Sequence, residues 1–252
     1  MLMGKKQRDI SFIRSWGSKT LVIACDSSGA IGSKELDLLK VSPRIVGYYT
    51  TRVALMEILS VGATPLAVIN TLSVEMNPTG YEIIEGIKDL LREAELPLDC
   101  INGSTEENFK TLQTGMGITI IGEVENDYCK LSKTEAGDII YLLGELKVGG
   151  EIQLPHDPTI CSLKDLQLLV SAKGVKEIIP VGSKGIGYEG ELLAALNGLQ
   201  FVPDDNLSVS LTKSGGPATA VIFSGSPNLE ENFEGLDTEI KGPLYKIGKV
   251  IK

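Results

Sequence analysis

Two kinds of apolar pattern alternate along this chain, and their alternation limits the folds that it can adopt. Thr20–Ala24 is a short apolar run, and Leu66–Val74 places mainly apolar residues at every second position, as strands do. Between them, Pro43–Val61 carries apolar residues at the three- and four-residue spacing of a helix. Gly117–Val124 and Ile139–Leu143 are further predicted strands. Because strands and helices interleave, the sequence predicts a mixed α/β (α+β) fold.

Two capping boxes predict where later helices begin. In this pattern the side chains of the first and fourth residues bind N–H groups that the first turn of a helix leaves free. Thr79–Glu82 and Ser162–Asp165 both have the pattern, and each precedes apolar residues at helical spacing. The elements expected after the second box are a strand at Glu177–Val181, a Gly-rich turn at Gly182–Gly187, a helix at Glu189–Leu196, and strands at Leu207–Leu211, at Ala218–Phe223 and near the C-terminus.

The length and one break in the pattern predict two domains. A chain of 252 residues is long enough for one or two domains. The turn-forming segment Glu135–Asp138 separates the two sets of elements. We therefore expect domains at 1–136 and 137–252.

Charge and composition exclude several classes of protein. Acidic residues outnumber basic residues 33 to 24, for a net charge of −9, whereas proteins that bind nucleic-acid backbones concentrate Lys and Arg. A local basic site for one small anion is still compatible with this balance. The chain lacks an apolar stretch of the ~18 residues that a membrane helix needs, and its first residues lack the apolar run of a signal peptide. The four cysteines have no zinc-site or redox spacing. We expect a cytoplasmic protein without nucleic-acid or membrane partners.

Three polar clusters follow predicted strands. They are Asp26–Gly29, Asn102–Asn108 and Gly182–Gly187. All three have an ordinary explanation as turns, because Asp, Asn, Ser and Gly are turn formers. A chemical role is the alternative: the adjacent carboxylates Glu106 and Glu107 can hold Mg²⁺, and a Gly-rich turn that opens a helix can direct N–H groups at a phosphate. The sequence leaves both explanations open.

Glu57 and His156 are two further residues whose sequence context suggests a role. Glu57 lies in a helix with little polar surface, where a buried unpaired carboxylate is costly, so it lies on a narrow exposed stripe or points at a metal or partner. His156 is the only histidine, which excludes a metal site built from several histidines. It stands in Pro155-His156-Asp157-Pro158, where it has either a structural or surface role or a role in proton transfer.

The order of these segments resembles the aminoimidazole ribonucleotide (AIR) synthetase-related superfamily. The segments that carry the resemblance are Asp26–Lys34, Leu59–Leu66, Ile101–Asn108 and Gly115–Glu125, and Gly137–Gly144 looks like the start of the second domain of the family. The superfamily includes thiamine-monophosphate kinase and selenophosphate synthetase. The resemblance implies a two-domain protein, a homodimer whose N-terminal domains form a β-barrel, and ATP- and Mg²⁺-dependent phosphoryl transfer or oxygen activation.

Site residues follow from the resemblance position by position. It implies metal ligands at Asp26, Glu57 and Glu107. The residues that it implies for ATP binding are Asp26, Ser27, Ser28, Lys34, Asn102, Gly103, Ser104 and Thr105. Ser104 replaces an acid of the family pattern and Asn102 replaces a glycine. Lys184 stands where the thiamine-phosphate kinases have a metal-binding Asp, which argues against that specificity.

Two segments look most like the alpha-ribazole kinases of corrinoid salvage. They are His156–Cys161 and Gly182–Glu189. This resemblance implies ATP-dependent phosphorylation of the 5′-hydroxyl of alpha-ribazole, for the lower ligand of cobalamin. Lys184 would then neutralise phosphate charge, and Asp157 or His156 would accept the hydroxyl proton. The alternatives are another small-molecule kinase or synthetase of the superfamily, and a nucleotide-binding regulator without turnover.

Overall fold

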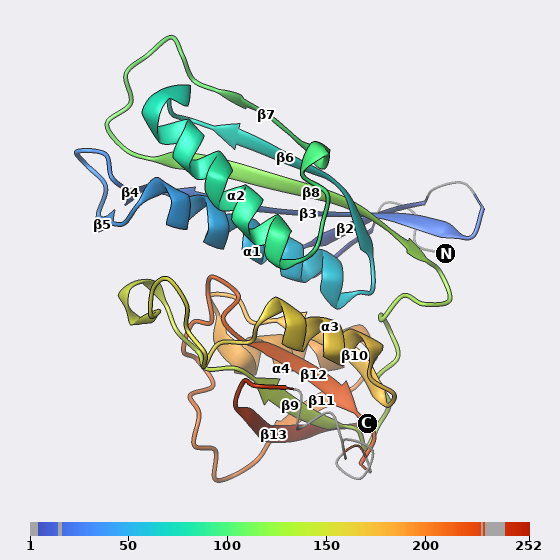
Figure 1. Cartoon of the computed structure of the whole chain (residues 1–252). Coiled ribbons are helices and arrows are strands. Elements are labelled where there is room, and N and C mark those ends of the chain that lie inside the picture. The colour runs from blue at the N-terminus through green and yellow to red at the C-terminus, as the bar shows by residue number, and fades with distance from the viewer. Residues whose placement is uncertain (1–4, 15–16, 228, 230–239) are drawn as a thin grey trace. The chain divides into compact units, whose positions relative to one another are not determined.

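A computed structural model describes residues 5–14, 17–227, 229 and 240–252, and it divides into two compact units (Figure 1). Unit 1 comprises Met1–Ile58 and Ala63–Asn126, and unit 2 comprises Leu59–Gly62 and Asp127–Lys252. The longer segment of unit 2 begins at Asp127, and the boundary predicted at 136–137 falls within this segment. The turn at that predicted boundary lies inside unit 2, where the backbone N–H of Gly137 donates to the carbonyl of Val250.

A six-stranded sheet forms the framework of unit 1. Its order is β1-β2-β3-β8-β6-β7. The strands are β1 (Lys5–Gln7), β2 (Ile10–Arg14), β3 (Lys19–Gly29), β6 (Thr64–Leu72), β7 (Ile101–Thr105) and β8 (Gly115–Glu125). β6 and β7 pair in parallel, and β8 is antiparallel to both β3 and β6. The strands β3, β6 and β7 therefore run in one direction, and their carboxyl ends lie at the same edge of the sheet.

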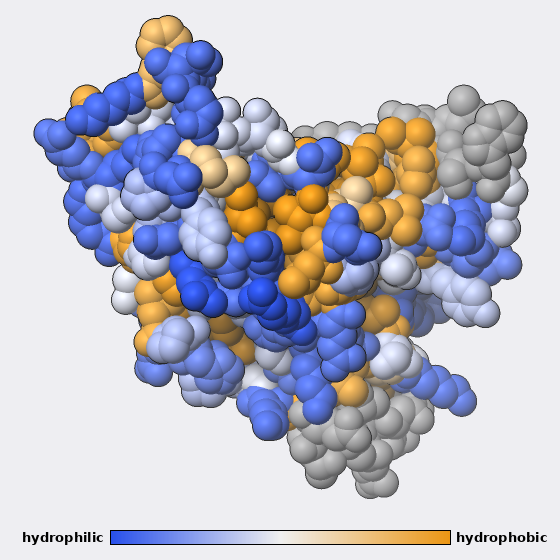
Figure 2. Space-filling view, turned by 45° about the horizontal axis from the view of Figure 1, so that its top comes forward, coloured by the Kyte–Doolittle hydropathy of each residue, from blue (hydrophilic) through white to orange (hydrophobic). Residues whose placement is uncertain are grey.

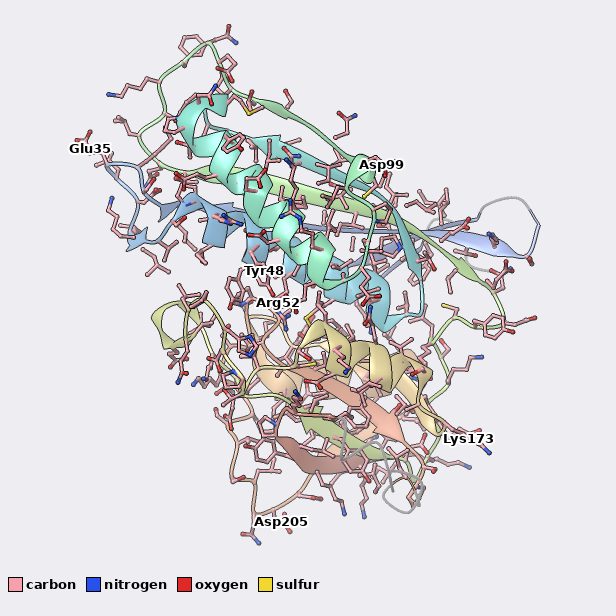
Figure 3. All side chains as sticks on the ribbon, viewed as in Figure 1. Glu35, Tyr48, Arg52, Asp99, Lys173 and Asp205 are labelled. Carbon is pink, nitrogen blue, oxygen red and sulfur yellow. The ribbon has the colours of Figure 1, made fainter. Side chains whose placement is uncertain are left out.

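Two long helices cover one face of this sheet (Figure 1). They are α1 (Pro43–Ser60) and α2 (Tyr81–Glu93), and both agree with the predicted periodicity. Gly47 and Gly86 let the two backbones touch, because a Cβ at either glycine would collide with a main-chain carbonyl of the other helix. Helix α1 is buried over most of its length, and even Arg52, labelled in Figure 3, is only 1% exposed.

Short elements connect these parts of unit 1. They are the two-stranded parallel pair β4 (Ile31–Gly32) and β5 (Leu39–Lys40), a π-helical turn at Met76–Gly80, and a 3₁₀ turn at Leu98–Cys100. The pair β4 and β5 follows β3, the π-helical turn follows β6, and the 3₁₀ turn leads into β7. They place polar residues at the edge described above.

Unit 2 is built on a five-stranded antiparallel sheet with the order β10-β12-β9-β13-β11. The strands are β9 (Ile139–Leu143), β10 (Val175–Pro180), β11 (Gln200–Pro203), β12 (Val221–Gly225) and β13 (Leu244–Ile251), with helices α3 (Leu163–Ser171) and α4 (Gly185–Leu196) and a 3₁₀ turn at Gly149–Glu151. Its core is aliphatic and includes Ile140, Leu142, Ile179, Ile222 and Ile247. The mixed α/β class predicted from the sequence is confirmed in both units.

The two capping boxes have different outcomes. Ser162 accepts from the N–H of Asp165, and the carboxylate of Asp165 accepts from the N–H of Ser162, so the second box is confirmed. The first box is wrong. Helix α2 begins at Tyr81 after Gly80, and the Thr79 hydroxyl donates to Glu75 instead. A π-helical turn leads directly into α2, so Thr79 lies within a turn and not at its start.

Two strand predictions need correction. Asp26–Gly29 was expected to follow a strand, with a turn as its ordinary explanation, but β3 continues through it because all eleven residues of β3 pair with β8. Leu207–Leu211 is not a strand; its apolar residues pack against the core of unit 2 from a loop, and β11 lies earlier, at Gln200–Pro203. Pairing with a long partner strand thus overrides turn propensity in the first case, and burial explains the apolar residues in the second.

Two findings concern the predicted barrel and the membrane. The sheet of unit 1 is open within the described residues, with β1 and β7 as its edge strands, so this part of the chain does not close a barrel by itself. Across the same described ranges, none of the helices combines the length and the apolar character that a membrane crossing requires.

Candidate functional site

The register of the sheet in unit 1 lines up residues that were predicted to bind ATP. Each predicted residue of β3 shares a row with one of β7, with β8 and β6 between them. The rows are Asp26–Ile118–Asn70–Gly103, Ser27–Gly117–Thr71–Ser104 and Ser28–Met116–Leu72–Thr105. A row spans three strand spacings, or about 14 Å. The sheet therefore gathers residues that are distant in sequence near the carboxyl ends of β3, β6 and β7.

Successive rows lie on opposite faces of the sheet, because side chains alternate along a strand. The middle row lies on the face opposite the helices, where Ser27, Thr71 and Ser104 are exposed. Gly117 keeps this row flat, since a Cβ there would lie 2.7 Å from the Thr71 hydroxyl oxygen. The row thus presents three hydroxyl groups on an open, level surface.

Asp26 belongs to the other face, with the core. Partial burial raises the pKa of its carboxyl above the usual value, although a backbone hydrogen bond from Ser27 opposes the change. In the same row, Asn70 is buried, and its amide donates to the carbonyl of Asn102 at 3.0 Å. Gly103 is required beside it, because a Cβ would collide with Asn70. Asn102 and Gly103 therefore help to hold edge strand β7 against β6.

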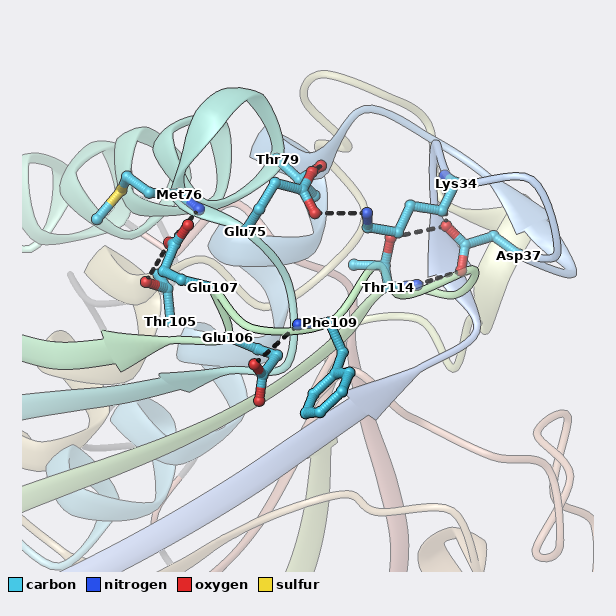
Figure 4. A network of polar contacts seen from close by, with 10 residues as sticks. All are labelled: Lys34, Asp37, Glu75, Met76, Thr79, Thr105, Glu106, Glu107, Phe109 and Thr114. Carbon is cyan, nitrogen blue, oxygen red and sulfur yellow. Dashed lines mark hydrogen bonds and ion pairs between the residues drawn. The ribbon is translucent and has the colours of Figure 1, made fainter.

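Lys34 lies at the carboxyl edge of the parallel strands, in a network of polar contacts (Figure 4). Its ammonium is 2.6 Å from Oε2 of Glu75, which lies shortly after the end of β6 at Leu72. The other carboxylate oxygen of Glu75 accepts from the Thr79 hydroxyl. Burial alone raises the pKa of Glu75, but the hydrogen bonds from Lys34 and Thr79 outweigh it and lower that pKa to about 2.

The main chain of Lys34 is held as well. Its N–H donates to Oδ2 of Asp37 at 2.8 Å, and the two carboxylate oxygens of Asp37 accept from the N–H and the hydroxyl of Thr114, each at 2.7 Å. These bonds outweigh the burial of Asp37 and hold its pKa below the usual value. Gly32 lies against this contact, where a Cβ would collide with Thr114. The loop that carries Lys34 is thus fixed to the start of β8.

The two carboxylates after β7 bind nearby donors. Glu107 accepts from the Thr105 hydroxyl at 2.7 Å and from the N–H of Met76 at 2.8 Å (Figure 4). Glu106 accepts from the N–H groups of Asn108 and Phe109. Glu107 therefore joins the ends of β7 and β6, and Glu106 caps the turn that follows.

Glu57 has a buried cation as its partner. The Arg8 guanidinium lies 3.3 Å from Oε2 of Glu57, with side chains 3% and 10% exposed. Of the two explanations left open by the sequence, the exposed stripe is thus wrong. The side chain points at a partner, and that partner is supplied by this chain.

The three carboxylates predicted to hold metal are not gathered in unit 1. Asp26 lies within β3, Glu57 pairs with Arg8, and Glu107 accepts from one N–H and one O–H donor. Among the described residues, no group of three or more His, Cys, Asp or Glu side chains is placed to hold a metal ion. The side chains of this chain alone do not fit a magnesium site made of these three carboxylates.

In unit 2, Asp157 is enclosed by donors. Its carboxylate accepts from the Lys147 ammonium at 2.7 Å, from the N–H of Gln153, and from both the N–H and the hydroxyl of Thr159. These bonds outweigh burial and hold the pKa of Asp157 well below its usual range. The side chain is 0% exposed, whereas the neighbouring His156 is exposed. Asp157 therefore fixes its loop and is a weak base.

Lys184 lies at the start of α4 in unit 2. It occupies the N-cap position, and its ammonium lies 4.0 Å from the centre of the Tyr188 ring. Gly185 has φ +79°, and a Cβ there would approach the carbonyl oxygens of the 211–213 loop. The predicted Gly-rich turn is thus partly helical, because α4 begins at Gly185.

Sequence reasoning missed the residues that hold Lys34. Glu75 lies 41 positions away from Lys34 in the sequence, and Thr114 lies 77 positions from Asp37. The only local signal is Thr79, which was assigned to a capping box with Glu82 and not to a contact with Glu75. Contacts of this kind become visible only when the strands are paired.

Comparisons with known proteins agree with this architecture. Residues 8–124 match the family model described as AIR synthase related protein, N-terminal domain. A comparison with curated protein sequences found no match.

Solved structures share the fold. Thiamine-monophosphate kinase from Stenotrophomonas maltophilia K279a aligns with a TM-score of 0.65 and 16% identity, over 98% of this chain and 90% of that one. Thiamine monophosphate kinase from Aquifex aeolicus aligns with a TM-score of 0.68 and 15% identity, over the same shares. T. maritima PurL complexed with ATP aligns with a TM-score of 0.62 and 19% identity, over 92% of this chain but only 40% of that one. Residues 8–124 thus match the N-terminal domain of the AIR synthase-related family, and the chain shares its fold with thiamine-monophosphate kinases and PurL.

Proposed function

We propose that this protein is an ATP-dependent phosphotransferase that acts on a hydroxyl group of a small molecule. The observation that carries the proposal is Lys34, held at the carboxyl edge of β3, β6 and β7, the same edge at which the exposed hydroxyl row of Ser27, Thr71 and Ser104 lies. Phosphoryl transfer depends mainly on positioning and on neutralising phosphate charge. An ammonium fixed at this edge of the sheet can neutralise phosphate charge, and the exposed hydroxyl groups of the row can donate hydrogen bonds that position a ligand.

The comparisons support the same reaction class. Two of the structures that share the fold are thiamine monophosphate kinases, and one structure is described as complexed with AMPPCP and TMP. In unit 1, the residues proposed to bind the nucleotide are Lys34 and the residues of the three rows that contain Asp26, Ser27 and Ser28. Mg²⁺ is commonly held by one or two carboxylates together with substrate phosphates. Because Asp26 and Glu107 are not gathered, each is proposed only as a single carboxylate ligand of an ion that the ATP phosphates otherwise hold.

The proposed acceptor is the 5′-hydroxyl of alpha-ribazole, in salvage of the lower ligand of cobalamin. The support for this finer proposal is Lys184, a cation at the start of α4 whose ammonium rests on the exposed ring of Tyr188. A charged lysine does not bind a metal, so its partner there would be a phosphate group. His156 is the better proton acceptor of the two predicted residues, since Asp157 is saturated with donors.

A screen of nucleosides with labelled ATP tests the proposal. Product is identified by mass spectrometry, with alpha-ribazole first and thiamine monophosphate as the comparison substrate. Phosphorylated alpha-ribazole is the expected product. Transfer to another alcohol instead would retain the phosphotransferase and overturn the substrate. ATP binding with no transfer to any alcohol would favour the alternative, a regulator without turnover.

A homodimer through unit 1 is the second part of the proposal. Hydrophobic residues gather in a broad patch in the space-filling view (Figure 2). On the sheet face opposite α1 and α2, Ile13 is 45% exposed, and its neighbours Leu21, Ile23 and Ile121 are only half-buried. A second copy would cover these side chains and extend the open sheet toward a barrel. Sedimentation at micromolar concentration is expected to show a dimer, and a monomer alone would overturn this part.

A further inference from the structure

We propose that Glu75 is the positioning residue for Lys34, holding its ammonium where it meets the phosphates of a bound nucleotide. This inference rests on the proposed nucleotide-binding role of unit 1 and assigns a function to a residue that the sequence did not single out. The ion pair itself is the first observation: Oε2 of Glu75 lies 2.6 Å from the lysine nitrogen, and the Lys34 side chain is only 13% exposed.

Glu75 is held in place by its own partners. Thr79 donates to its second carboxylate oxygen, and its carbonyl accepts from the N–H of Gly80 at 2.9 Å. Thr79 is buried in the turn that leads into α2. The Thr79 hydroxyl orients Glu75, and Glu75 orients Lys34, so the position of the ammonium is linked to the start of α2.

The lysine is fixed at both ends. Asp37 and Thr114 hold its main chain, and Glu75 holds its amine (Figure 4). A free lysine side chain has several rotatable bonds, and ordering it on a ligand costs conformational entropy. Holding the side chain in advance removes that cost. Protein kinases use the same logic on an unrelated fold, where a glutamate ion pair must hold the lysine that contacts phosphate.

An ammonium group has three N–H donors, and the pair with Glu75 uses one of them. Donors therefore remain for phosphate oxygens while the ion pair persists. Because the pKa of Glu75 is about 2, the carboxylate stays charged at neutral pH. Protonation is thus not a means of releasing the lysine in that range, and Lys34 is held whenever the protein is folded.

Positioning and simple charge repulsion predict opposite effects of Glu75→Gln. Removal of a carboxylate reduces the negative charge near an anion, so repulsion alone predicts tighter ATP binding. Positioning predicts weaker binding, by about fivefold, because the lysine is no longer held. ATP binding to the full chain, measured by calorimetry without acceptor, separates the two.

The test is a double-mutant cycle with Lys34→Met, Glu75→Gln and both changes together. Glu75→Gln is expected to weaken ATP binding in the parent chain and to have no further effect in the Lys34→Met background. Thr79→Val, which removes the donor to Glu75, is expected to give a smaller loss with the same dependence on Lys34. Glu85→Gln is the matched control, because Glu85 forms a 2.7 Å pair with Lys88 on α2. It is expected to leave ATP binding unchanged.

Each outcome bears on one proposal. If Glu75→Gln binds ATP as well as the parent or better, or if its effect persists without Lys34, positioning by Glu75 is overturned. If Glu75→Gln does not fold, Thr79→Val carries the same comparison, and equal binding by that variant overturns the inference. If the parent chain binds no ATP, the proposed function fails before the cycle begins, which is a different result from a cycle that shows no coupling.

Discussion

A lysine–carboxylate pair of nearly equal length stands at the candidate residues of each unit, but the two pairs differ in what surrounds them. Lys34–Glu75 in unit 1 is 2.6 Å long and Lys147–Asp157 in unit 2 is 2.7 Å long. The Glu75 side chain is 31% exposed, whereas that of Asp157 is 0% exposed and accepts from four donors. Distance alone does not separate a site from a structural tie. The burial of the carboxylate and the number of donors that it accepts do separate them.

The largest expected effect is on the stability of unit 2. Asp157→Asn leaves Lys147 without its counter-ion inside the protein, and breaking a buried pair in this way costs about 3 kcal/mol of the free energy of unfolding. Glu75→Gln, at a more exposed pair, is expected to cost about 1 kcal/mol or less. Denaturant unfolding of the two variants measures both. Equal losses would mean that exposure does not distinguish the pairs.

The next effect is on transfer. Lys184→Met keeps the length of the side chain and removes its charge, and we expect a loss of about 3 kcal/mol in transition-state stabilisation. The corresponding rate of phosphoryl transfer is lower by about two orders of magnitude. Product formation is followed by mass spectrometry, with circular dichroism to check the fold. A fully active variant would remove Lys184 from the reaction and leave unit 1 as the site of all the proposed phosphate contacts.

A third prediction concerns acid. The pKa of Glu75 falls from 4.5 to about 2 on folding, so its ion pair stabilises the folded state above pH 4.5, and this contribution is lost as the pH falls through 2. Between pH 6 and pH 3 the parent chain is expected to lose most of the contribution of this group, which the partial exposure of the pair limits to about 1 kcal/mol. Glu75→Gln should therefore show a smaller loss of unfolding free energy over that range. An identical loss in parent and variant would show that Glu75 is not paired in solution.

The smallest effect is expected from single carboxylates of unit 1. Asp26→Asn and Glu107→Gln should each weaken Mg·ATP binding or turnover by about tenfold. Glu107 is exposed, so its replacement should leave the circular dichroism spectrum unchanged. Unchanged activity in both variants would remove these residues from the proposed set of metal ligands. Glu57 is already a poor candidate for that set, because it forms an ion pair with Arg8.

Local patterns explain why much of the fold was predictable. The apolar spacing of α1, the alternation of β6 and β8, and the reciprocal cap at Ser162 are properties of neighbouring residues, and all appear in the structure. The order of the superfamily segments was also readable in the sequence, and the family model matches residues 8–124. The wrong predictions were local patterns that the surrounding structure did not follow. The Thr79 hydroxyl, for example, donates to Glu75 and does not cap α2.

Candidate site residues were predictable in type but not in arrangement. Ser27 and Ser104 were both named from the sequence, yet only the register of β3, β8, β6 and β7 puts them in one exposed row. Asp157 was named from the sequence as a candidate base. Only the structure shows that Lys147, Gln153 and Thr159 donate to its carboxylate and make it a weak base. Glu75 was not named at all.

The sequence by itself therefore determined most of the helices and strands and the mixed α/β class, because hydrophobic periodicity and capping act between near neighbours. Only the tertiary structure decided which charges meet. Lys34 pairs with Glu75, and Glu57 with Arg8, across 41 and 49 positions of the chain. The strength of such pairs depends on distance and on burial from water, and both arise only when strands and helices pack together.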